Sequence, residues 1–488
     1  MRSGPAGQYP RPVTEPRTVA LLTLGCARND VDSDELAATL TRAGFTVVND
    51  VGDDNGHDNG HGDGGGHVEP DVVVVNTCGF VAQAKAESIA TLLEAAGDGR
   101  PVVAVGCMAE RYGRELAAEL PEAAAVVGFD GYVTIADTLS RVISGEPVES
   151  HDPFDRRTLL PLTPVERPGL TQPPGHGPVL DLPGSKRLRL RRGPVAPVKI
   201  ASGCDRRCSF CAIPRFRGSF VSRSPGDILA ESAWLVADEG VREIVLVSEN
   251  STSYGKDLGD PRLLESLLPQ FASLPGLARV RVSYLQPAEM RPTLLHAMTD
   301  TEIVAPYFDL SFQHASGPLL RRMRRFGDID SFLGLIAAIR ERSPQAGIRS
   351  NVIVGFPGET ETDVEILEEF LSAAELDAVG VFAYSDEDDT EAVELPDHID
   401  PDEISARVDR VAALAEVVSA QRAADRVGST QRLVVERSQR TRAVGRLGFQ
   451  GPEDGETSVV VQGSTPGDAF DVRVVASQGV DLVAEVIS

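Results

Sequence analysis

Residues 201–214 read "ASGCDRRCSFCAIP" and set Cys204, Cys208 and Cys211 at a C-x3-C-x2-C spacing directly after an apolar segment. Three thiolates suit an iron-sulfur cubane, in which three irons are held by the protein and the fourth iron stays open to an outside ligand. Zinc needs four ligands, usually at paired spacings, and neither a second pair nor a nearby histidine accompanies this loop. The spacing therefore favours an iron-sulfur cluster over zinc.

The segments around this loop alternate between apolar runs and helical patterns. Six strand-like runs are found, at residues 196–203, 243–250, 278–285, 307–314, 347–356 and 378–386. With the helical segments between them and a last one at 401–426, they predict a partial (β/α)6 barrel over residues 195–426. The cysteine loop follows the first strand, on the face where barrel enzymes place their chemistry.

Residues 17–145 show the same alternation and predict a doubly wound parallel sheet. Cys26, Cys78 and Cys107 each come just after a strand-like run. The carboxyl ends of parallel strands meet at one edge of such a sheet, where ligands bind. A lone buried cysteine usually acts as a small hydrophobic residue. Three at one edge instead predict a second three-cysteine site, which accounts for all six cysteines of the chain.

The remaining segments are predicted from composition. Residues 52–67, "GDDNGHDNGHGDGGGH", hold no apolar side chain and predict a disordered insertion, with adventitious metal binding by its histidines as the alternative. Residues 146–194 are rich in proline and predict a linker. Its basic run at 186–193, "KRLRLRRG", is either a solvated arm or a contact to phosphate or substrate. Short strands and Gly, Pro and Asp turns over 427–488 predict a small antiparallel β-barrel.

Length and charge bound the class of protein. A chain of 488 residues predicts about three domains. No apolar run approaches the roughly 20 residues of a membrane span, and the N-terminus lacks the apolar region of a secretory signal. We therefore expect a cytoplasmic protein. Because the cytoplasm is reducing, its cysteines are expected to be ligands or nucleophiles and not disulfides. The net charge of −26 predicts repulsion from bare nucleic acid and attraction to a basic partner, unless it serves solubility alone.

The cysteine loop, with the aromatic Phe210 before its last cysteine, resembles the radical S-adenosylmethionine (SAM) superfamily. The resemblance implies that the amino and carboxyl groups of SAM occupy the open iron, and that the reduced cluster cleaves SAM to a 5′-deoxyadenosyl radical. Similar enzymes contact SAM at positions that correspond here to Gln313, His314 and Arg349, and Phe210 is a further candidate for SAM binding. Gly355 and Gly358 follow the fifth strand, where small residues let the backbone approach a ligand closely. Tight turns and buried, satisfied polar groups are the alternatives for these positions.

The whole chain resembles the methylthiotransferase family, which has an auxiliary-cluster domain, a radical-SAM barrel and a TRAM barrel. Nine segments follow the family's order and spacing: "LGCARNDVDSDE", "VNTCGFVAQAKAES", "AVGCMAERY", "GCDRRCSFCAIPRFRG", "VSRSP", "SYGKDLG", "FQHAS", "GFPGETETD" and "YSDEDDTEA". The resemblance implies two 4Fe-4S clusters, one on each cysteine set, and an external electron donor. It also implies that a methylthio group is inserted at an unactivated carbon after radical hydrogen abstraction, with a second SAM as methyl donor.

The segments "DVDSDE", "NTCGFVAQAKAES" and "SYGKDLG" resemble the branch that modifies an aspartate of small-subunit ribosomal protein twelve, a basic substrate. Glu249-Asn250 and Asp388-Asp389 depart from that branch's usual residues. The alternatives are a tRNA adenosine methylthiotransferase and a non-catalytic iron-sulfur protein that binds RNA. The predicted C-terminal barrel has five arginines that suit either RNA contact or a solvated face: Arg432, Arg437, Arg440, Arg442 and Arg446. We expect a monomer.

Overall fold

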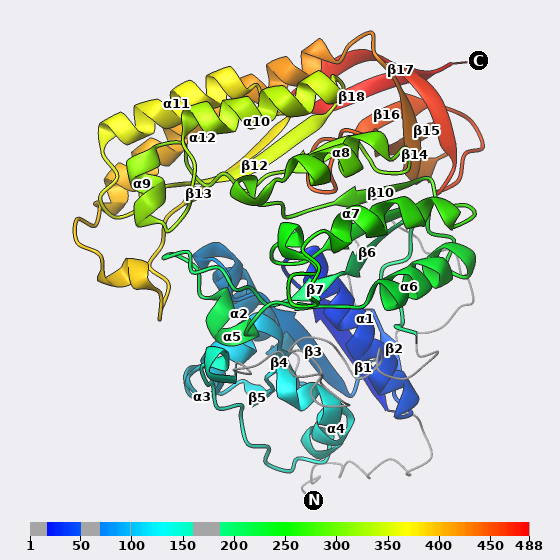
Figure 1. Cartoon of the computed structure of the whole chain (residues 1–488). Coiled ribbons are helices and arrows are strands. Elements are labelled where there is room, and N and C mark those ends of the chain that lie inside the picture. The colour runs from blue at the N-terminus through cyan, green and yellow to red at the C-terminus, as the bar shows by residue number, and fades with distance from the viewer. Residues whose placement is uncertain (1–16, 50–68, 98, 160–185, 488) are drawn as a thin grey trace, which may run out of the picture. The chain divides into compact units, whose positions relative to one another are not determined.

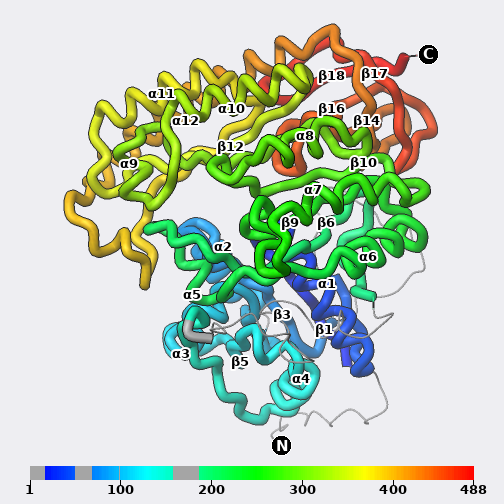
Figure 2. The backbone as a smooth tube through the Cα atoms, in the orientation of Figure 1, coloured from blue at the N-terminus to red at the C-terminus, as the bar shows by residue number. Residues whose placement is uncertain are grey.

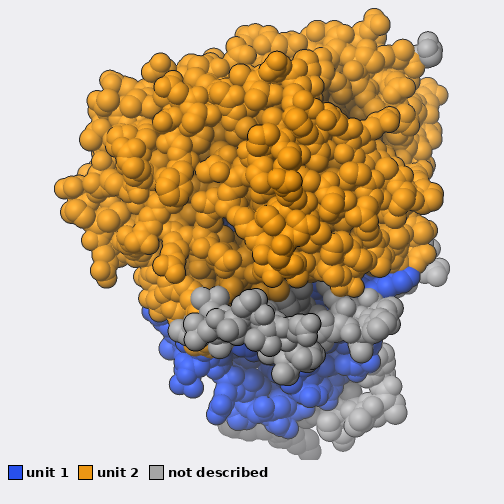
Figure 3. All heavy atoms as spheres, viewed as in Figure 1, with its two compact units in different colours: residues 1–153, 176–190 blue, residues 154–175, 191–488 orange. Residues whose placement is uncertain are grey.

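The structure is a computed structural model that describes residues 17–49, 69–97, 99–159 and 186–487. The chain divides into two compact units (Figure 3), unit 1 with residues 1–153 and 176–190 and unit 2 with residues 154–175 and 191–488. The histidine-containing tract, with His57, His61 and His67, lies outside the described residues. In the described part of the chain, no helix is long and apolar enough to cross a membrane.

Unit 1 is built on a parallel sheet. Its strands are β1 (Thr18–Thr23), β2 (Thr46–Val48), β3 (Val72–Thr77), β4 (Val102–Val105) and β5 (Ala123–Val126). Their order is β2-β1-β3-β4-β5, so the winding direction reverses between β1 and β3. The sequence "VVVVNT" of β3 is buried throughout, as expected for a parallel strand covered on both faces. The predicted doubly wound sheet is confirmed.

Within its described residues, unit 1 has four α-helices: α1 (Ala27–Arg42), α2 (Ala82–Ala96), α3 (Gly106–Glu119) and α4 (Ile135–Ile143). The carboxyl ends of β1, β3 and β4 lead directly into the segments that carry Cys26, Cys78 and Cys107. Ligands of doubly wound sheets bind where the strand order reverses. The fold therefore places all three cysteines at the edge that usually binds a ligand.

The first part of unit 2 is a sheet of six principal strands. These are β6 (Val195–Lys199), β9 (Glu243–Val247), β10 (Arg279–Val282), β11 (Tyr307–Asp309), β12 (Gly347–Val354) and β13 (Ala378–Ala383). Parallel pairing gives β6-β9-β10 (Figure 2) and β11-β12-β13, and single bridges such as Leu285 to Leu310 join the two halves. A short pair, β7 (Ala201–Ser202) with β8 (Val221–Ser222), flanks the cysteine loop. The predicted partial (β/α)6 barrel is confirmed.

Helices connect these strands: α5 (Ile213–Arg217), α6 (Pro225–Ala237), α7 (Leu263–Leu267), α8 (Pro292–Asp300), α9 (Gly317–Arg322), α10 (Ile329–Arg342), α11 (Glu361–Ala374) and α12 (Pro401–Asp425). Helices α10, α11 and α12 lie side by side, and α12 packs on β13 (Figure 1). Thr360 starts α11 with a capping box to Asp363, which satisfies free backbone amides. Phe312, Phe332 and Phe370 form an aromatic cluster in the core.

The C-terminal strands form a closed barrel: β14 (Thr430–Gln439), β15 (Arg442–Arg446), β16 (Thr457–Val460), β17 (Ala469–Gln478) and β18 (Asp481–Val486). Its order is β14-β15-β16-β18-β17. The prediction of a small barrel is confirmed, with one difference in strand direction. β16 and β18 pair in parallel, because the β17–β18 hairpin returns the chain beside β16.

Arginines of the partial barrel fix the C-terminal barrel in place. Arg281 pairs with Glu243 at 2.8 Å and donates to the Gly448 carbonyl at 2.9 Å. Arg279 pairs with the same carboxylate and donates to the Arg446 carbonyl at 2.8 Å. Glu243 and Arg279 are the first residues of β9 and β10. The C-terminal barrel therefore packs on the amino ends of these strands, away from the end that carries the cysteine loop.

The basic run at 186–193 differs from a solvated arm. Arg187 and Arg189 are buried. Arg187 pairs with Asp34 of α1 at 3.1 Å, and the Leu190 amide donates to the same carboxylate at 2.9 Å. Burial, partly offset by Arg187, raises the pKa of Asp34 to about 6. The solvated-arm interpretation is wrong for these two arginines, because a buried carboxylate needs a cationic partner.

We predict that Gly347→Ala loosens the docked C-terminal barrel. A Cβ at Gly347 would overlap the backbone carbonyl of Phe449, so the two barrels must separate. We expect the free energy of unfolding to fall by about 1–3 kcal/mol, as for other overpacked sites, measured by calorimetry on the full chain. Gly334→Ala in α10 is the matched control, since its Cβ meets nothing and should stabilise by about 1 kcal/mol. Equal melting of both variants would contradict the prediction.

Candidate functional site: two sets of three cysteines

The cysteine loop of unit 2 is held by its own backbone and by neighbouring segments. The Cys204 amide donates to the Gly218 carbonyl at 3.1 Å, and the Cys211 amide donates to the Cys208 carbonyl at 3.1 Å. Cys204 is buried, whereas Cys208 and Cys211 are partly exposed. The loop is therefore anchored through its backbone at both Cys204 and Cys211.

Burial and mutual repulsion disfavour the ionised form of these thiols. Burial raises the pKa of Cys204 to about 11, with Cys208 adding to the effect. The pKa of Cys211 is raised further by burial and by the charges of Cys208 and Cys204. Thiol ligands lose their protons when they bind a metal, and the positive charge of bound iron would offset the repulsion between the thiolates.

The donor set fits an iron-sulfur cluster. It consists of three thiols on one loop, the soft ligands that such clusters use. In the part of the chain that the structure describes, no group of three or more His, Cys, Asp or Glu side chains is arranged to hold one metal ion. Cys204, Cys208 and Cys211 would hold three irons of a cluster.

Ser209, between two of the cysteines, ties the loop to α9 and to the segment after β13. Its amide donates to the Met323 carbonyl at 3.2 Å, and its hydroxyl donates to the Arg322 carbonyl at 2.9 Å. Its carbonyl accepts from the Ala392 amide at 2.9 Å. Two distant segments of the barrel thus fix the centre of the cysteine loop.

Glu289, after β10, gathers polar groups at the carboxyl ends of the strands. It pairs with Arg206 of the cysteine loop at 2.6 Å and with Lys256 at 3.0 Å. Its second oxygen accepts from Asn250 at 3.1 Å and from Ser253 at 2.9 Å. Burial alone would raise the pKa of Glu289, but Arg206 and these hydrogen bonds lower it to about 2. Glu289 therefore remains ionised and tethers the loop to the barrel.

Of the predicted SAM contacts, Gln313 follows β11 and pairs with β12 through its backbone. Gln313 has a φ of +71° and exchanges backbone hydrogen bonds with Asn351 and Ile353. Phe210 packs against the core. Contact of these residues with SAM stays a prediction.

The two glycines that follow β12 already have close protein neighbours. A Cβ at Gly355 would lie 2.7 Å from Ile404, and one at Gly358 would overlap the guanidinium of Arg322. The need for glycine at these positions thus has an explanation within the protein. Their contact with SAM also stays a prediction.

Two other candidates have protein partners. His314 is fully buried, accepts from the Ser316 amide at 3.0 Å, and has a pKa lowered by burial to about 4, so it is neutral. Arg349 lies near the amino end of β12 and pairs with Asp309 at 3.5 Å, Glu453 at 2.8 Å and Asp454 at 3.2 Å. The structure therefore does not bring Arg349 to the cysteine loop.

In unit 1, the segments that carry Cys26, Cys78 and Cys107 converge. A Cβ at Gly25 would lie 3.1 Å from the Cys78 sulfur, and a Cβ at Gly79 would lie 2.8 Å from the Met108 amide nitrogen, next to Cys107. The Cys107 sulfur is 3.8 Å from Asn29 Oδ1, three residues after Cys26. Because each glycine lacks a side chain, the neighbouring cysteine segments can approach closely. The donor set again fits an iron-sulfur cluster.

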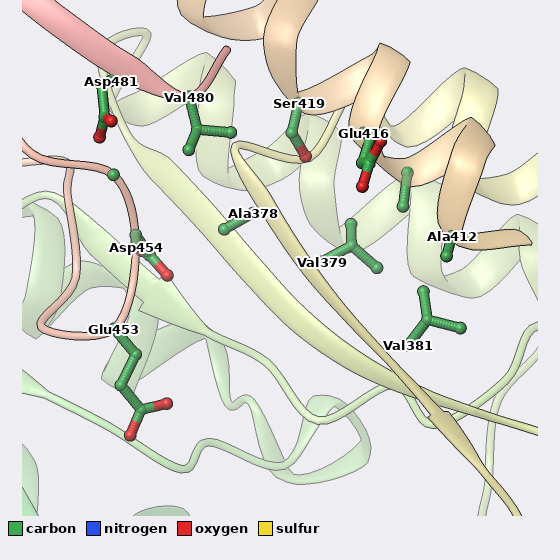
Figure 4. A pocket seen from close by; sticks show the side chains of 12 residues that line it. Ala378, Val379, Val381, Ala412, Glu416, Ser419, Glu453, Asp454, Val480 and Asp481 are labelled. Atoms are coloured by element: carbon green, nitrogen blue, oxygen red, sulfur yellow. The ribbon is translucent and has the colours of Figure 1, made fainter. Parts of the chain in front are cut away.

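A cavity of about 400 Å³ lies elsewhere, among β13, α12 and loops of the C-terminal barrel (Figure 4). Its floor includes Ala378 and Val379, and its acidic lining includes Glu416, Glu453 and Asp481. No cysteine lines it. The cavity is therefore separate from the thiol chemistry.

Three models of known families match separate parts of the chain. The sequence models described as "Uncharacterized protein family UPF0004", "Radical SAM superfamily" and "TRAM domain" match residues 18–128, 198–371 and 427–487. The structure of radical S-adenosylmethionine methyltransferase TsrM from Kitasatospora setae, with cobalamin and a 4Fe-4S cluster bound, is similar with a TM-score of 0.50. It is 17% identical and covers 76% of this chain and 75% of that chain, which indicates the fold alone.

The partial barrel and its three-cysteine loop define a radical SAM protein. Ribosomal protein uS12 methylthiotransferase RimO of Saccharopolyspora erythraea is 57% identical over 474 residues, 96% of this chain and 94% of that protein. RimO of Nocardioides sp. is 56% identical over 492 residues, 97% of this chain and 98% of that protein. The chain belongs to the RimO family of methylthiotransferases, which confirms the resemblance noted in the sequence.

Sequence reasoning missed the residues that hold the cysteine loop. Arg206 lies inside the motif, but its partner Glu289 is far along the chain. Arg325, which contacts Cys208, lies in the run "RRMRRF", whose arginines look alike in sequence. Nothing in local spacing distinguishes these side chains from solvated ones.

We predict that Glu289→Gln weakens the barrel and removes a pH dependence. Because the folded pKa is about 2 and the ordinary value 4.5, ionised Glu289 stabilises above pH 4.5, and this stabilisation is lost as the pH falls toward 2. The variant should lose about 1–3 kcal/mol at pH 7 and lack this part of the acid slope, measured by denaturant unfolding from pH 2 to 7. Asp300→Asn, which removes an exposed pair with Arg342, should keep the slope. An unchanged slope in Glu289→Gln would refute the assignment.

Proposed function

We propose that this chain transfers a methylthio group to the β-carbon of an aspartate in small-subunit ribosomal protein uS12. The observation that carries the proposal is the presence of two separate three-cysteine sites in one chain, combined with relatives named for this activity at 57% and 56% identity. A cluster on each site accounts for all six cysteines.

The chain's own residues bind and orient. When bound, a 4Fe-4S cluster on Cys204, Cys208 and Cys211 supplies reductive cleavage of SAM, and a cluster on Cys26, Cys78 and Cys107 supplies the handling of sulfur. Ser209 and Arg206 hold the first loop in one position. Fixed geometry of this kind is how a protein contributes to cofactor chemistry.

Charge supports a basic protein as the substrate. The chain carries a net charge of −26, which attracts a basic partner. On the TRAM barrel, Arg437 pairs with Glu456 and Arg446 pairs with Glu436, so these two arginines are neutralised. Exposed Arg432, Arg440 and Arg442 leave a smaller basic area for RNA contact. We further propose that the enzyme is cytoplasmic and monomeric and takes electrons from a separate donor protein.

Cysteine variants of the full chain separate the two roles. We expect replacement of Cys204, Cys208 and Cys211 by alanine to abolish 5′-deoxyadenosine formation, because no site remains for SAM cleavage. Replacement of the other three cysteines should keep 5′-deoxyadenosine formation but abolish methylthiolation. Chromatography of SAM products and mass spectrometry of substrate measure both under anaerobic reduction. Methylthiolation by the second variant would contradict the assignment of roles.

Deletion of the gene separates the two substrate classes. We expect ribosomal protein uS12 from the deletion strain to be lighter than the wild-type protein by about 46 Da, because a hydrogen remains where the methylthio group would be. The methylthio content of tRNA should not change. Complementation with the unaltered chain is the control. Loss from tRNA with unchanged uS12 would overturn the substrate in favour of the adenosine alternative.

A further inference from the structure

A short turn at the end of α9, residues 320–326, lies against the cysteine loop of unit 2. The Arg325 amide donates to the Leu320 carbonyl at 2.7 Å, and Arg324 adopts a φ of +55°, so the chain reverses direction there. The same turn accepts two hydrogen bonds from Ser209 through the Met323 and Arg322 carbonyls. The turn is therefore firmly attached to the loop that would hold the SAM-cleaving cluster.

Arg325 is buried in this contact and holds two points at once. Its Nη1 lies 3.7 Å from the Cys208 sulfur, and its Nη2 donates to the Ser311 carbonyl just after β11. One planar guanidinium thus connects a cluster ligand to a barrel strand. Both N–H groups are oriented by the same rigid fork.

The other arginines of the turn are directed elsewhere. Arg324 pairs with Glu391 at 2.6 Å and is about half exposed. Arg322 donates to the Pro396 carbonyl at 3.2 Å. Arg325 is the arginine of this turn whose guanidinium reaches a cysteine, and Arg324 offers a neighbouring cation without that contact.

A fixed cation beside a ligating thiolate changes the properties of a cluster. Hydrogen bonds to the sulfurs and net charge near the cluster set the reduction potential of iron-sulfur sites. Arginine stays protonated under all ordinary conditions, so its effect is permanent. Reduction adds one negative charge to the cluster, which a nearby positive charge stabilises.

We propose that Arg325 is a positioning residue that holds Cys208 in place and raises the reduction potential of the cluster bound there. The inference rests on the proposed function, because it requires a cluster on Cys204, Cys208 and Cys211. The electron comes from a low-potential one-electron donor and adds to the oxidised cluster without a bond change. Arg325 acts through Cys208 and takes no part in the chemistry itself.

The test uses the full chain with Cys26, Cys78 and Cys107 replaced by alanine, so that one cluster remains. After anaerobic reconstitution with iron and sulfide, the cluster is titrated with dithionite and followed by electron paramagnetic resonance. We expect Arg325→Met to lower the ratio of reduced to oxidised cluster about tenfold at a fixed potential, which is about 59 mV for one electron. The reduction potential of Arg325→Lys should lie between those of the parent and Arg325→Met. The reduction potential of Arg324→Met should equal that of the parent.

Each outcome decides the inference. Loaded Arg325→Met with the parent's potential overturns it, as does an equal shift in Arg324→Met. If Arg325→Met binds no iron, Arg325→Lys decides: a lowered potential supports the inference and an unchanged one overturns it. If both Arg325 variants lose iron while their melting temperatures stay unchanged, the result supports the role of Arg325 in positioning Cys208. If both lose iron and also melt at lower temperatures, the result overturns that role.

The proposed function fails in a different way. A parent that binds no iron removes the cluster and the inference together. If the parent binds iron and cleaves SAM but loaded Arg325→Met has the parent's reduction potential, the inference is wrong and the proposed function stands.

Discussion

Each unit has to bring three thiols together, and the protein around each set is arranged to meet that requirement. The pKa of Cys204 is raised to about 11, because burial and the neighbouring thiol both disfavour its charge. Such a group of thiolates is stable only around a cationic centre. The surrounding protein must therefore hold the cysteine segments together without the help of their own side chains.

Both units meet this constraint at the carboxyl ends of parallel strands. In unit 1, closely approaching segments follow β1, β3 and β4, and Gly25 and Gly79 make room for the approach. In unit 2, one loop carries all three thiols, and side chains from other strands hold it, with Glu289 on Arg206 at 2.6 Å. Two different local solutions thus give similar donor sets, because parallel strands direct their loops to one edge.

Buried arginines organise the two ends of the partial barrel in different ways. At the amino ends of the strands, Arg279 and Arg281 share Glu243 and donate to carbonyls of the TRAM barrel. At the carboxyl ends, Arg206 and Arg325 hold the cysteine loop. A planar guanidinium with five donors in a fixed fork can satisfy a carboxylate and a carbonyl together in one set geometry. The separation keeps the docked TRAM barrel clear of the thiols.

Local patterns were enough to predict the fold class, because apolar periodicity is read from neighbouring residues, and cysteine spacing was enough to propose the two ligand sets. It did not determine the partners of single charged residues. Arg187 was expected in a linker yet is buried on Asp34, and Arg349 was expected near SAM yet pairs with Glu453 of the TRAM barrel. Glu289 and Arg325 carried no local signal. These partners come from the folded chain, since each lies far along the sequence and is selected by burial and not by local pattern.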